Sequence, residues 1–386
     1  MPDDRWKSEY QLTLQLYSTA AEVQASIANF QRVEELIAEV LEHAQSLDDR
    51  LRSYMTLVNA LGQHHSMKRA IKVAIEVLGA LGVRMDRPTK LNIVRSYLKT
   101  KAKLRNKTVE DIMALPPMTD ERKLACVELM LVMLNYLYIG QSPALPLFVF
   151  RIIQVCLRYG RCPGMSGAFA GYGFLLCGWF NDYEGGVRFG KLGLTLASSD
   201  GVKSCIVQTF TNFYAGVDFW QNPVKESIDD IKYGSRLAWE IGVVDFAVLM
   251  EALCAMHQYY AGVPLSVVIR CVDECINHCK VYKQENVLIG MNAMMQFLRN
   301  AAGASKAKGN LSGSIFNKNS ALLETEEMNL DLVAVLVRFY SMESAYLFND
   351  LNECQEVFSQ NFQHKRSPSP MYRAQKMNMV EALIAI

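Results

Sequence analysis

Three cysteines and a histidine form the densest set of chemically competent side chains in the sequence. Cys271, Cys275 and Cys279 follow one another at intervals of four residues, and His278 adjoins the last of them. Thiolates and imidazoles at this density could hold zinc or carry out thiol redox chemistry. Zinc ligands usually come from turns in closely spaced pairs, however, whereas these thiols would follow one face of a helix. We interpret them as core residues and predict no metal site and no cofactor.

Histidines and carboxylates elsewhere do not form an obvious acid–base pair. His64 and His65 stand together in a predicted turn, without a carboxylate or cysteine nearby in the sequence. The glutamates Glu324, Glu326 and Glu327 are expected to open a helix, where the helix dipole favours acidic side chains. The remaining histidines are too scattered to nominate a general base. The sequence therefore predicts a protein that is not an enzyme, with an all-α enzyme as the least favoured alternative.

The strongest charged features are a basic run and two Ser-Pro pairs. Alternate positions from Lys99 to Lys107 carry Lys or Arg, and Tyr97 is the one aromatic residue close to them. We interpret this run as a solvated helix face rather than a phosphate-binding patch. Ser367 and Ser369 each precede a proline and follow two basic residues, as in proline-directed phosphorylation sites. Phosphate added there could switch partner binding by changing the local charge.

Large side chains also recur with the spacing of a structural repeat. Two rows share a spacing of 41 residues: Trp179 with Trp220 and Phe219 with Tyr260 in one, and Leu175, Gly216 and His257 in the other. Aromatic rings that carry polar groups are well suited to peptide and protein recognition. We predict that these residues line a concave, partner-binding groove, with both indoles on one surface. The alternative is that the two tryptophans pack between helix layers.

The elements that must position these residues are expected to be helices. The chain has 386 residues, of which 51% are apolar and 20% charged, and its 40 basic and 39 acidic residues leave a net charge of +1. This balance argues against a nucleic-acid-binding surface. No apolar run reaches the roughly 18 residues of a membrane span. The charged N-terminus has no apolar segment after it, and the 10 cysteines are scattered through apolar runs, so we expect a cytoplasmic protein that does not enter a membrane.

A helical skeleton repeats along the chain at spacings of 37 and 41 residues. Apolar or small residues recur at offsets of 0, 3, 7, 10 and 11, which lie on one helix face. The units are predicted to start at Phe30, Met67, Tyr183, Val224, Leu265 and Leu351, several of them directly after an Asn or Asp that would cap the helix. One helix pair cannot bury its apolar face alone, so neighbouring pairs must stack. The predicted fold is all-α, a superhelical solenoid of stacked antiparallel helix pairs.

The whole chain, 1–386, is predicted to be a single helical-repeat array. Residues 303–320 are rich in Gly, Ser, Asn and Lys and are expected to form a flexible loop, while residues 363–370 are expected to form an exposed connector. The apolar C-terminal residues 382–386 favour a piece of a longer polypeptide over a C-terminus packed on the last repeat.

The repeat spacing and turns resemble tetratricopeptide repeats, although both spacings exceed that family's usual length. Residues 168–178, 181–194 and 115–120, together with Trp6, Tyr17 and Ala21, give a closer resemblance to the helical-repeat region of large multidomain signalling ATPases. In that family a Ser/Thr kinase-like domain and a P-loop ATPase precede this region, and a GAF domain and a histidine kinase often follow it. The sequence has no phosphate loop, no kinase catalytic loop and no phospho-acceptor histidine helix. The resemblance therefore implies the family's repeats and none of its enzymatic activities.

These observations predict a non-catalytic helical-repeat scaffold for protein–protein interaction or regulation in a multidomain signalling ATPase or kinase system. Its partner would be a protein or peptide in the concave groove, or neighbouring domains of a larger polypeptide. An alternative is a small-ligand sensor, in which the aromatic rows close over an inducer. An enclosed apolar pocket would favour the sensor and an open groove the peptide.

Overall fold

The computed structural model describes residues 5–27, 29–64, 66–304, 309–313, 315–328, 330–363 and 371–384. Within these ranges the chain forms twenty α-helices and two short 3-10 helices, and the one β-type contact is an isolated bridge between Pro117 and Arg161. The predicted all-α helical-repeat fold is confirmed. None of the described helices is long and apolar enough to cross a membrane.

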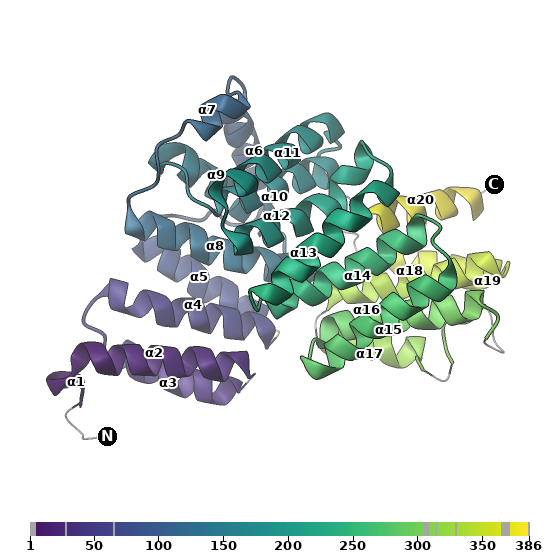
Figure 1. Ribbon diagram of the computed structural model, residues 1–386, viewed down its shortest axis with the longest axis horizontal. Coiled ribbons are helices and arrows are strands. Elements are labelled where there is room, and N and C mark those ends of the chain that lie inside the picture. Colours follow the sequence, from purple (N-terminus) through teal and green to yellow (C-terminus); the bar gives the residue numbers. More distant parts are fainter. Residues whose placement is uncertain are drawn as a thin grey trace. The chain divides into compact units, whose positions relative to one another are not determined.

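The helices group into two compact units, residues 1–164 and 165–386, here called the N-terminal and C-terminal units. The N-terminal unit contains α1 (Arg5–Ser8), α2 (Tyr10–Ser26), α3 (Phe30–His43), α4 (Leu47–Gln63), α5 (Met67–Ala80), α6 (Lys90–Leu104), α7 (Val109–Met113), α8 (Glu121–Ile139) and α9 (Leu145–Tyr159). Helix α8 packs on α4 and α5, whereas α6 packs on α9 (Figure 1). Whether the whole chain forms a single array stays a prediction.

The C-terminal unit contains α10 (Met165–Trp179), α11 (Tyr183–Asp200), α12 (Lys203–Gly216), η1 (Asp218–Trp220), η2 (Val224–Ser227), α13 (Ile228–Glu240), α14 (Val244–Tyr260), α15 (Leu265–Val281), α16 (Glu285–Ala301), α17 (Lys318–Glu327), α18 (Asp331–Leu347), α19 (Leu351–Gln363) and α20 (Tyr372–Ile384). Successive first helices of the pairs lie beside one another, from α10 through α12, α14 and α16 to α18. We call these five helices the A-helix layer. Helices α11, α13, α15 and α19 pack against it as their partners.

The repeat skeleton places its helices correctly. Helices α3, α5, α11, α15 and α19 begin at the predicted unit starts, and the fourth predicted start, Val224, begins η2, which leads into α13. The residues at offsets 3, 7 and 10 are buried in α3, α5, α11 and α15, as at Val33, Ile37 and Val40 of α3. The turns before α11 and α19 use the predicted Asn-Asp pairs. In the first of them Asn181 has a positive φ of 53° and Asp182 Oδ1 accepts a hydrogen bond from the Gly185 amide at 2.9 Å.

Close helix approach in the C-terminal unit depends on glycine. A Cβ atom at Gly173 of α10 would lie 2.5 Å from the carbonyl oxygen of Gly186 and 2.9 Å from the amide nitrogen of Gly190, both in α11. These backbone atoms cannot move away as a flexible side chain could. The small residues predicted at these offsets therefore bring α10 and α11 into backbone contact.

The region around α17 differs in part from expectation. Helix α17 begins at Lys318, inside the predicted loop 303–320, because the Asn317 side chain caps it by accepting from the Ser320 amide at 3.0 Å. Glu324, Glu326 and Glu327 lie at its C-terminal end, so the prediction that they open the helix was wrong. Within the loop, Leu311 is fully buried, and the Asn300 side chain donates to the Asn310 carbonyl at 2.9 Å. Of the predicted connector 363–370, all but the end of α19 lies outside the described residues.

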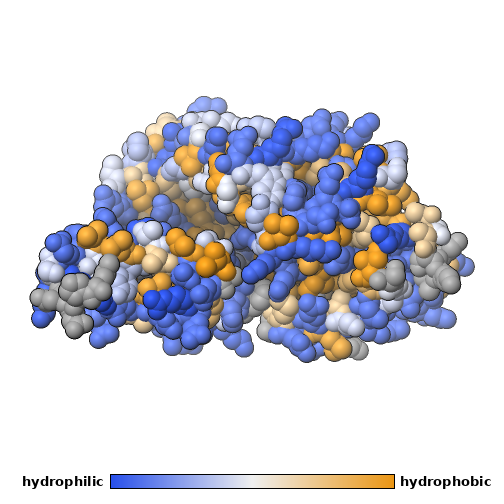
Figure 2. Space-filling view, turned by 60° about the horizontal axis from the view of Figure 1, so that its bottom comes forward, coloured by the Kyte–Doolittle hydropathy of each residue, from blue (hydrophilic) through white to orange (hydrophobic). Residues whose placement is uncertain are grey.

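The visible surface has no large apolar band. In Figure 2 hydrophilic residues predominate, with hydrophobic ones scattered among them. Single exposed apolar side chains are normal on folded proteins.

Candidate partner-binding surface

The residues predicted to bind a partner lie at the C-terminal ends of helices in the A-helix layer. Trp179 is the last residue of α10, and Phe219 and Trp220 form part of η1, which directly follows α12. Tyr260 is the last residue of α14. These four side chains are half-buried. Their placement on a concave surface stays a prediction.

Aromatic rings in this region form a continuous chain of contacts. Trp220 stacks on Tyr183 with a centroid distance of 4.0 Å and meets Phe219 at 5.1 Å. Phe219 in turn contacts Tyr372 of α20 edge-to-face at 5.6 Å, and Tyr372 meets Tyr260 at 4.6 Å. The two members of the predicted Phe219–Tyr260 row are therefore joined by a ring from the C-terminal helix. Sequence reasoning missed Tyr372 because no repeat spacing connects it to either residue.

The chain of rings continues into the core of the unit. Tyr260 contacts Tyr259 at 5.6 Å and Phe339 of α18 at 6.5 Å, and Phe339 meets Tyr340 at 5.1 Å. Such tilted and edge-to-face pairs are the favoured aromatic geometries. We call Phe219, Trp220, Tyr259, Tyr260, Phe339 and Glu343 the aromatic surface.

One carboxylate gives the aromatic surface its charge. Glu343 of α18 is 5% exposed and pairs with Lys376 of α20, whose ammonium also lies 5.0 Å from the centre of the Tyr259 ring. The Tyr259 hydroxyl donates to Glu343 Oε2 at 3.1 Å. Burial and the neighbouring carboxylate raise the pKa of Tyr259, so this phenol stays protonated and remains a donor.

Several buried polar atoms of this region have no hydrogen-bond partner among the described residues. They are Trp220 Nε1, the hydroxyls of Tyr260 and Tyr340, and Glu343 Oε1. Burial raises the pKa of both tyrosines, against the opposing effect of the Arg373 charge. Buried polar groups without partners cost free energy, so they are uncommon and often occur where a further group binds.

The second predicted row lies deeper than the first. Leu175 is 1% exposed, His257 is 2% exposed, and Gly216 is the buried last residue of α12. The Ser227 hydroxyl donates to the Val224 carbonyl at 2.8 Å, so its oxygen accepts from Nδ1 of His257 at 2.8 Å. Burial lowers the pKa of His257 to about 4, so this imidazole is neutral at physiological pH. A contribution of Leu175 and His257 to partner binding stays a prediction.

The cysteine set belongs to the packing of α15. Cys275 and Cys279 are fully buried, and Cys271 is half-buried. A hydrogen bond with the Cys279 thiol, together with burial, raises the pKa of Cys275, so its thiol stays protonated. His278 instead contacts Glu251, with 2.9 Å between Nδ1 and Oε2, and Glu251 also accepts from the Trp239 indole at 2.8 Å.

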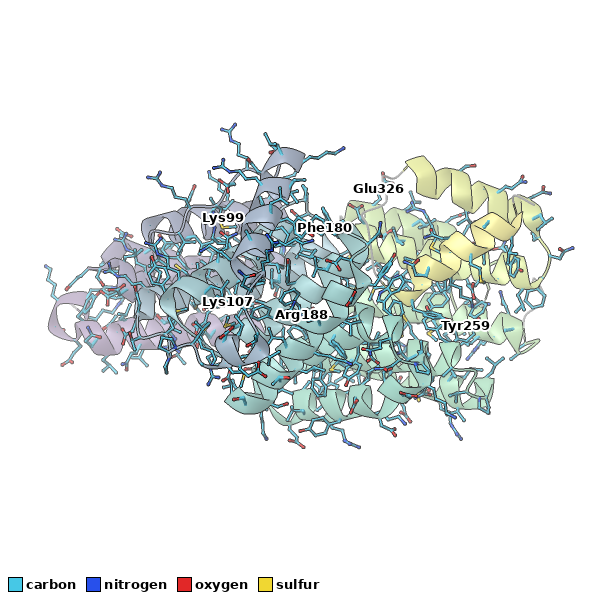
Figure 3. All side chains as sticks on the ribbon, turned by 90° about the horizontal axis from the view of Figure 1, so that it is seen from above. Lys99, Lys107, Phe180, Arg188, Tyr259 and Glu326 are labelled. Atoms are coloured by element: carbon cyan, nitrogen blue, oxygen red, sulfur yellow. The ribbon has the colours of Figure 1, made fainter. Side chains whose placement is uncertain are left out.

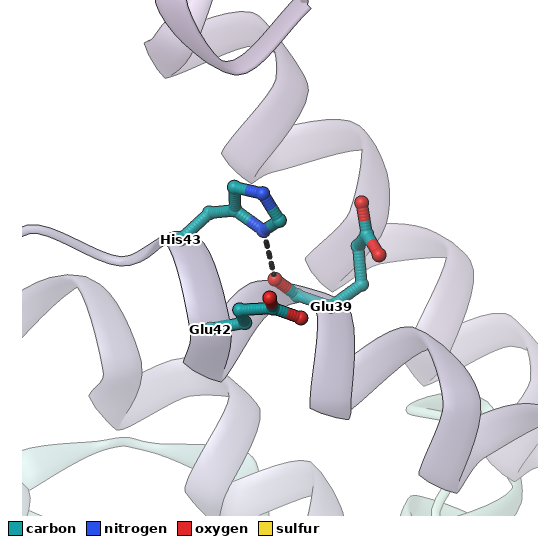
Figure 4. Close-up of side chains that lie close together, drawn as sticks. All are labelled: Glu39, Glu42 and His43. Carbon is teal, nitrogen blue, oxygen red and sulfur yellow. Dashed lines mark hydrogen bonds between the residues drawn. The ribbon is translucent and has the colours of Figure 1, made fainter. Parts of the chain in front are cut away.

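Glu39, Glu42 and His43 of α3 lie close enough together to suggest a metal site. Glu39 and His43 make other contacts, as Figure 4 shows for the bond from His43 Nδ1 to the Glu39 carbonyl oxygen, 3.0 Å long. Glu39 Oε1 accepts from the indole of Trp6 at 3.0 Å, and this bond lowers the pKa of Glu39. Trp6 also stacks on His43 at 4.9 Å. The group therefore anchors the N-terminal helices.

The other features singled out in the sequence lie in or near α4 and α6, or outside the described ranges. In the basic run, Lys99 and Lys103 are exposed on α6 and Lys107 lies beyond its end (Figure 3). His64 ends α4 and stacks on Phe30 at 4.3 Å. His65, Ser367 and Ser369 lie outside the described residues.

Comparison with known proteins identifies a similar fold but no matching protein family. No protein-family model matches the chain, and no curated protein does either. A solved structure described as a Rap protein complexed with competence and sporulation factor matches with a TM-score of 0.50 and 10% sequence identity, covering 96% of this chain and 98% of that one. The two chains share a helical-repeat fold. At this identity the likeness concerns the fold alone.

Proposed function

We propose that the chain is a non-catalytic helical-repeat scaffold that binds a protein or peptide partner on the aromatic surface of its C-terminal unit. The observation that carries the proposal is the combination of a continuous aromatic chain with buried polar atoms that have no partner among the described residues. Aromatic anchors surrounded by polar groups are typical of binding hot spots. The Rap structure, whose description names a bound factor, supports the use of this fold for binding.

The wider context belongs to the same proposal. The resemblance of residues 168–178 and 181–194 to the repeats of multidomain signalling ATPases favours a regulatory role in such an ATPase or kinase system, in the cytoplasm. The lowered pKa of the buried His257 makes it a weak base, and the raised pKa of Cys275 disfavours a nucleophilic thiolate, which supports a non-enzymatic role. Phosphorylation of Ser367 or Ser369 would then regulate partner binding.

Partner capture with paired tryptophan variants tests the proposal. The wild-type chain and the Trp179→Ala plus Trp220→Ala variant are used as baits, and captured proteins are quantified by mass spectrometry. The matched control is Trp239→Ala, because Trp239 lies on α13, outside the A-helix layer. We expect the double variant to lose partners that the wild type and the control retain. Unchanged partners, with helicity and melting temperature preserved, would contradict the proposal.

A further inference from the structure

The C-terminal helix α20 does not extend the repeat stack. A terminal helix that capped the array would continue along α18 and α19 as the next layer. Instead, Tyr372 of α20 reaches Phe219 in η1 and Tyr260 in α14, while Lys376 reaches Glu343 in α18. Helix α20 therefore crosses several repeats and lies on the aromatic surface.

The side of α20 that packs on the rest of the C-terminal unit has the pattern of a helical binding motif. Arg373, Met377 and Val380 are 6%, 3% and 0% exposed and recur with helical spacing, so they form one buried stripe. Beside it, Tyr372 and Lys376 are one helical turn apart and supply an aromatic ring and a cation. Met379, by contrast, is 51% exposed.

Helix α20 provides hydrogen-bond partners for only some of the buried polar atoms of the aromatic surface and its neighbour Tyr340. Lys376 contacts Glu343 through Oε2, whereas Glu343 Oε1 and the hydroxyls of Tyr260 and Tyr340 have no hydrogen-bond partner among the described residues. An ammonium is a point charge, but a guanidinium presents a planar fork that can bind both oxygens of a carboxylate. A helix carrying Arg in place of Lys would engage both oxygens of Glu343.

We propose that α20 is a displaceable internal ligand, and that the aromatic surface beneath it binds a basic helical segment of a partner protein. The partner segment carries an aromatic residue at one position and an arginine four residues later, matching Tyr372 and Lys376. Its arginine pairs with the carboxylate of Glu343, and its aromatic ring contacts the rings of Phe219 and Tyr260. This inference rests on the proposed function and specifies its partner. The partner must displace α20, so the chain is self-inhibited until such a segment arrives.

A labelled peptide tests the exchange in the full chain. The probe is a fluorescent peptide with the sequence of residues 371–384, in its natural form and as K376R, and binding is followed by fluorescence anisotropy. A full-length Tyr372→Ala plus Lys376→Ala variant has a loosened α20, while Met379→Ala is the matched control on the exposed side. If α20 covers the surface nine-tenths of the time, its release tightens binding by about tenfold. We therefore expect the loosened chain to bind up to that much tighter than the wild type, and the control to match the wild type.

The arginine preference is the more specific outcome. We expect the K376R peptide to bind the loosened chain about fivefold tighter than the natural peptide, since a forked donor reaches both oxygens of Glu343. A further Glu343→Gln substitution should weaken binding and remove this preference. No binding to a folded loosened chain, or equal binding to wild-type and loosened chains, would overturn the proposal.

Hydrogen exchange on the wild-type chain tests the proposal even if the loosened variant does not fold. Saturating K376R peptide should speed amide exchange in α20 and leave exchange in α15 unchanged, whereas unchanged exchange in α20 would count against displacement. The two proposals fail separately. Partner capture that depends on Trp179 and Trp220, without peptide exchange, leaves the binding function and removes the role of α20. Peptide exchange without any such partner removes the proposed function alone.

Discussion

Helices α3 and α11, one from each unit, use different residues at the same repeat positions. In the N-terminal unit, α3 buries Val33, Ile37 and Val40 at offsets 3, 7 and 10, whereas α11 of the C-terminal unit buries Gly186, Gly190 and Gly193 there. Aliphatic side chains fill the space between two helices, whereas glycines, which have no side chain, allow the two backbones to come into contact. The same skeleton thus gives aliphatic packing at α3 and close backbone contact between α10 and α11.

Polar groups lie in contrasting environments at one site in each unit. In the N-terminal unit, ion pairs such as Arg69–Glu34 lie on the surface, with side chains 61% and 38% exposed. In the C-terminal unit, His257 and Glu343 are buried and the hydroxyl of Tyr260 has no partner among the described residues. A surface of this kind costs stability, which is expected where binding rather than packing determines the residues.

The largest effect should come from pH acting on His257. Its folded-state pKa of about 4 lies below the ordinary histidine value of 6.5, so the unfolded chain binds more protons in this interval. Stability should therefore be full near pH 7 and fall as the pH drops, by about 2.5 kcal/mol at pH 4.5. Denaturant unfolding at both pH values measures this. In His257→Gln the loss of stability between pH 7 and pH 4.5 should be smaller by that amount. If stability depended on pH in the same way in both proteins, His257 would not be the group responsible.

Two glycine-to-alanine substitutions, one in each unit, should have different effects on the free energy of unfolding. Gly173→Ala places a Cβ against the α11 backbone and should lower the free energy of unfolding by about 2 kcal/mol. Gly79 of α5 has no neighbouring atom within 4 Å of such a Cβ, so Gly79→Ala should be neutral or stabilise by up to about 1 kcal/mol. Chemical denaturation of both variants provides the test. Equal effects would contradict the close contact between α10 and α11 at Gly173.

Ion-pair coupling should differ in the same direction. A double-mutant cycle on Glu343 and Lys376 should give a coupling free energy of about 1–2 kcal/mol, because Glu343 is buried and removal of its partner leaves a charge uncompensated. The matched cycle on Glu34 and Arg69, both partly exposed, should give about 0.5 kcal/mol or less. Unfolding of the four proteins in each cycle yields both values. A coupling at Glu34–Arg69 as large as that at Glu343–Lys376 would contradict the account.

The smallest effects should come from removing single hydroxyl groups. Tyr10 donates to Asp49 Oδ2 at 2.8 Å and accepts from the Gln45 amide at 3.0 Å, so Tyr10→Phe should cost about 1 kcal/mol. Tyr260→Phe removes a buried hydroxyl without a partner among the described residues and should be neutral or slightly stabilising. Thermal melts compare the two. A cost at Tyr260 equal to that at Tyr10 would show that its hydroxyl is satisfied.

The sequence predicts the helices far better than the surface they build. Helix starts such as Phe30 and Leu265 follow from local signals, namely the 3.6-residue period and the polar turns, and these survive in the folded chain. The ring of Tyr372 reaches Phe219 across more than 150 residues of sequence, and no periodicity encodes that contact. Glu343 and Lys376 are likewise ordinary charged residues until folding joins them. At α17, the Asn317 cap outweighed the acidic signal that predicted a later helix start.

Photo-crosslinking at position 219 tests the central claim most directly. A benzophenone amino acid replaces Phe219 in the full-length chain, and crosslinked peptides are identified by mass spectrometry after irradiation. Because Phe219 contacts Tyr372, the account predicts crosslinks to residues 371–384, and excess K376R peptide should transfer them to the added peptide. Crosslinks that never include this segment, or that stay on it at saturating peptide, would contradict the account.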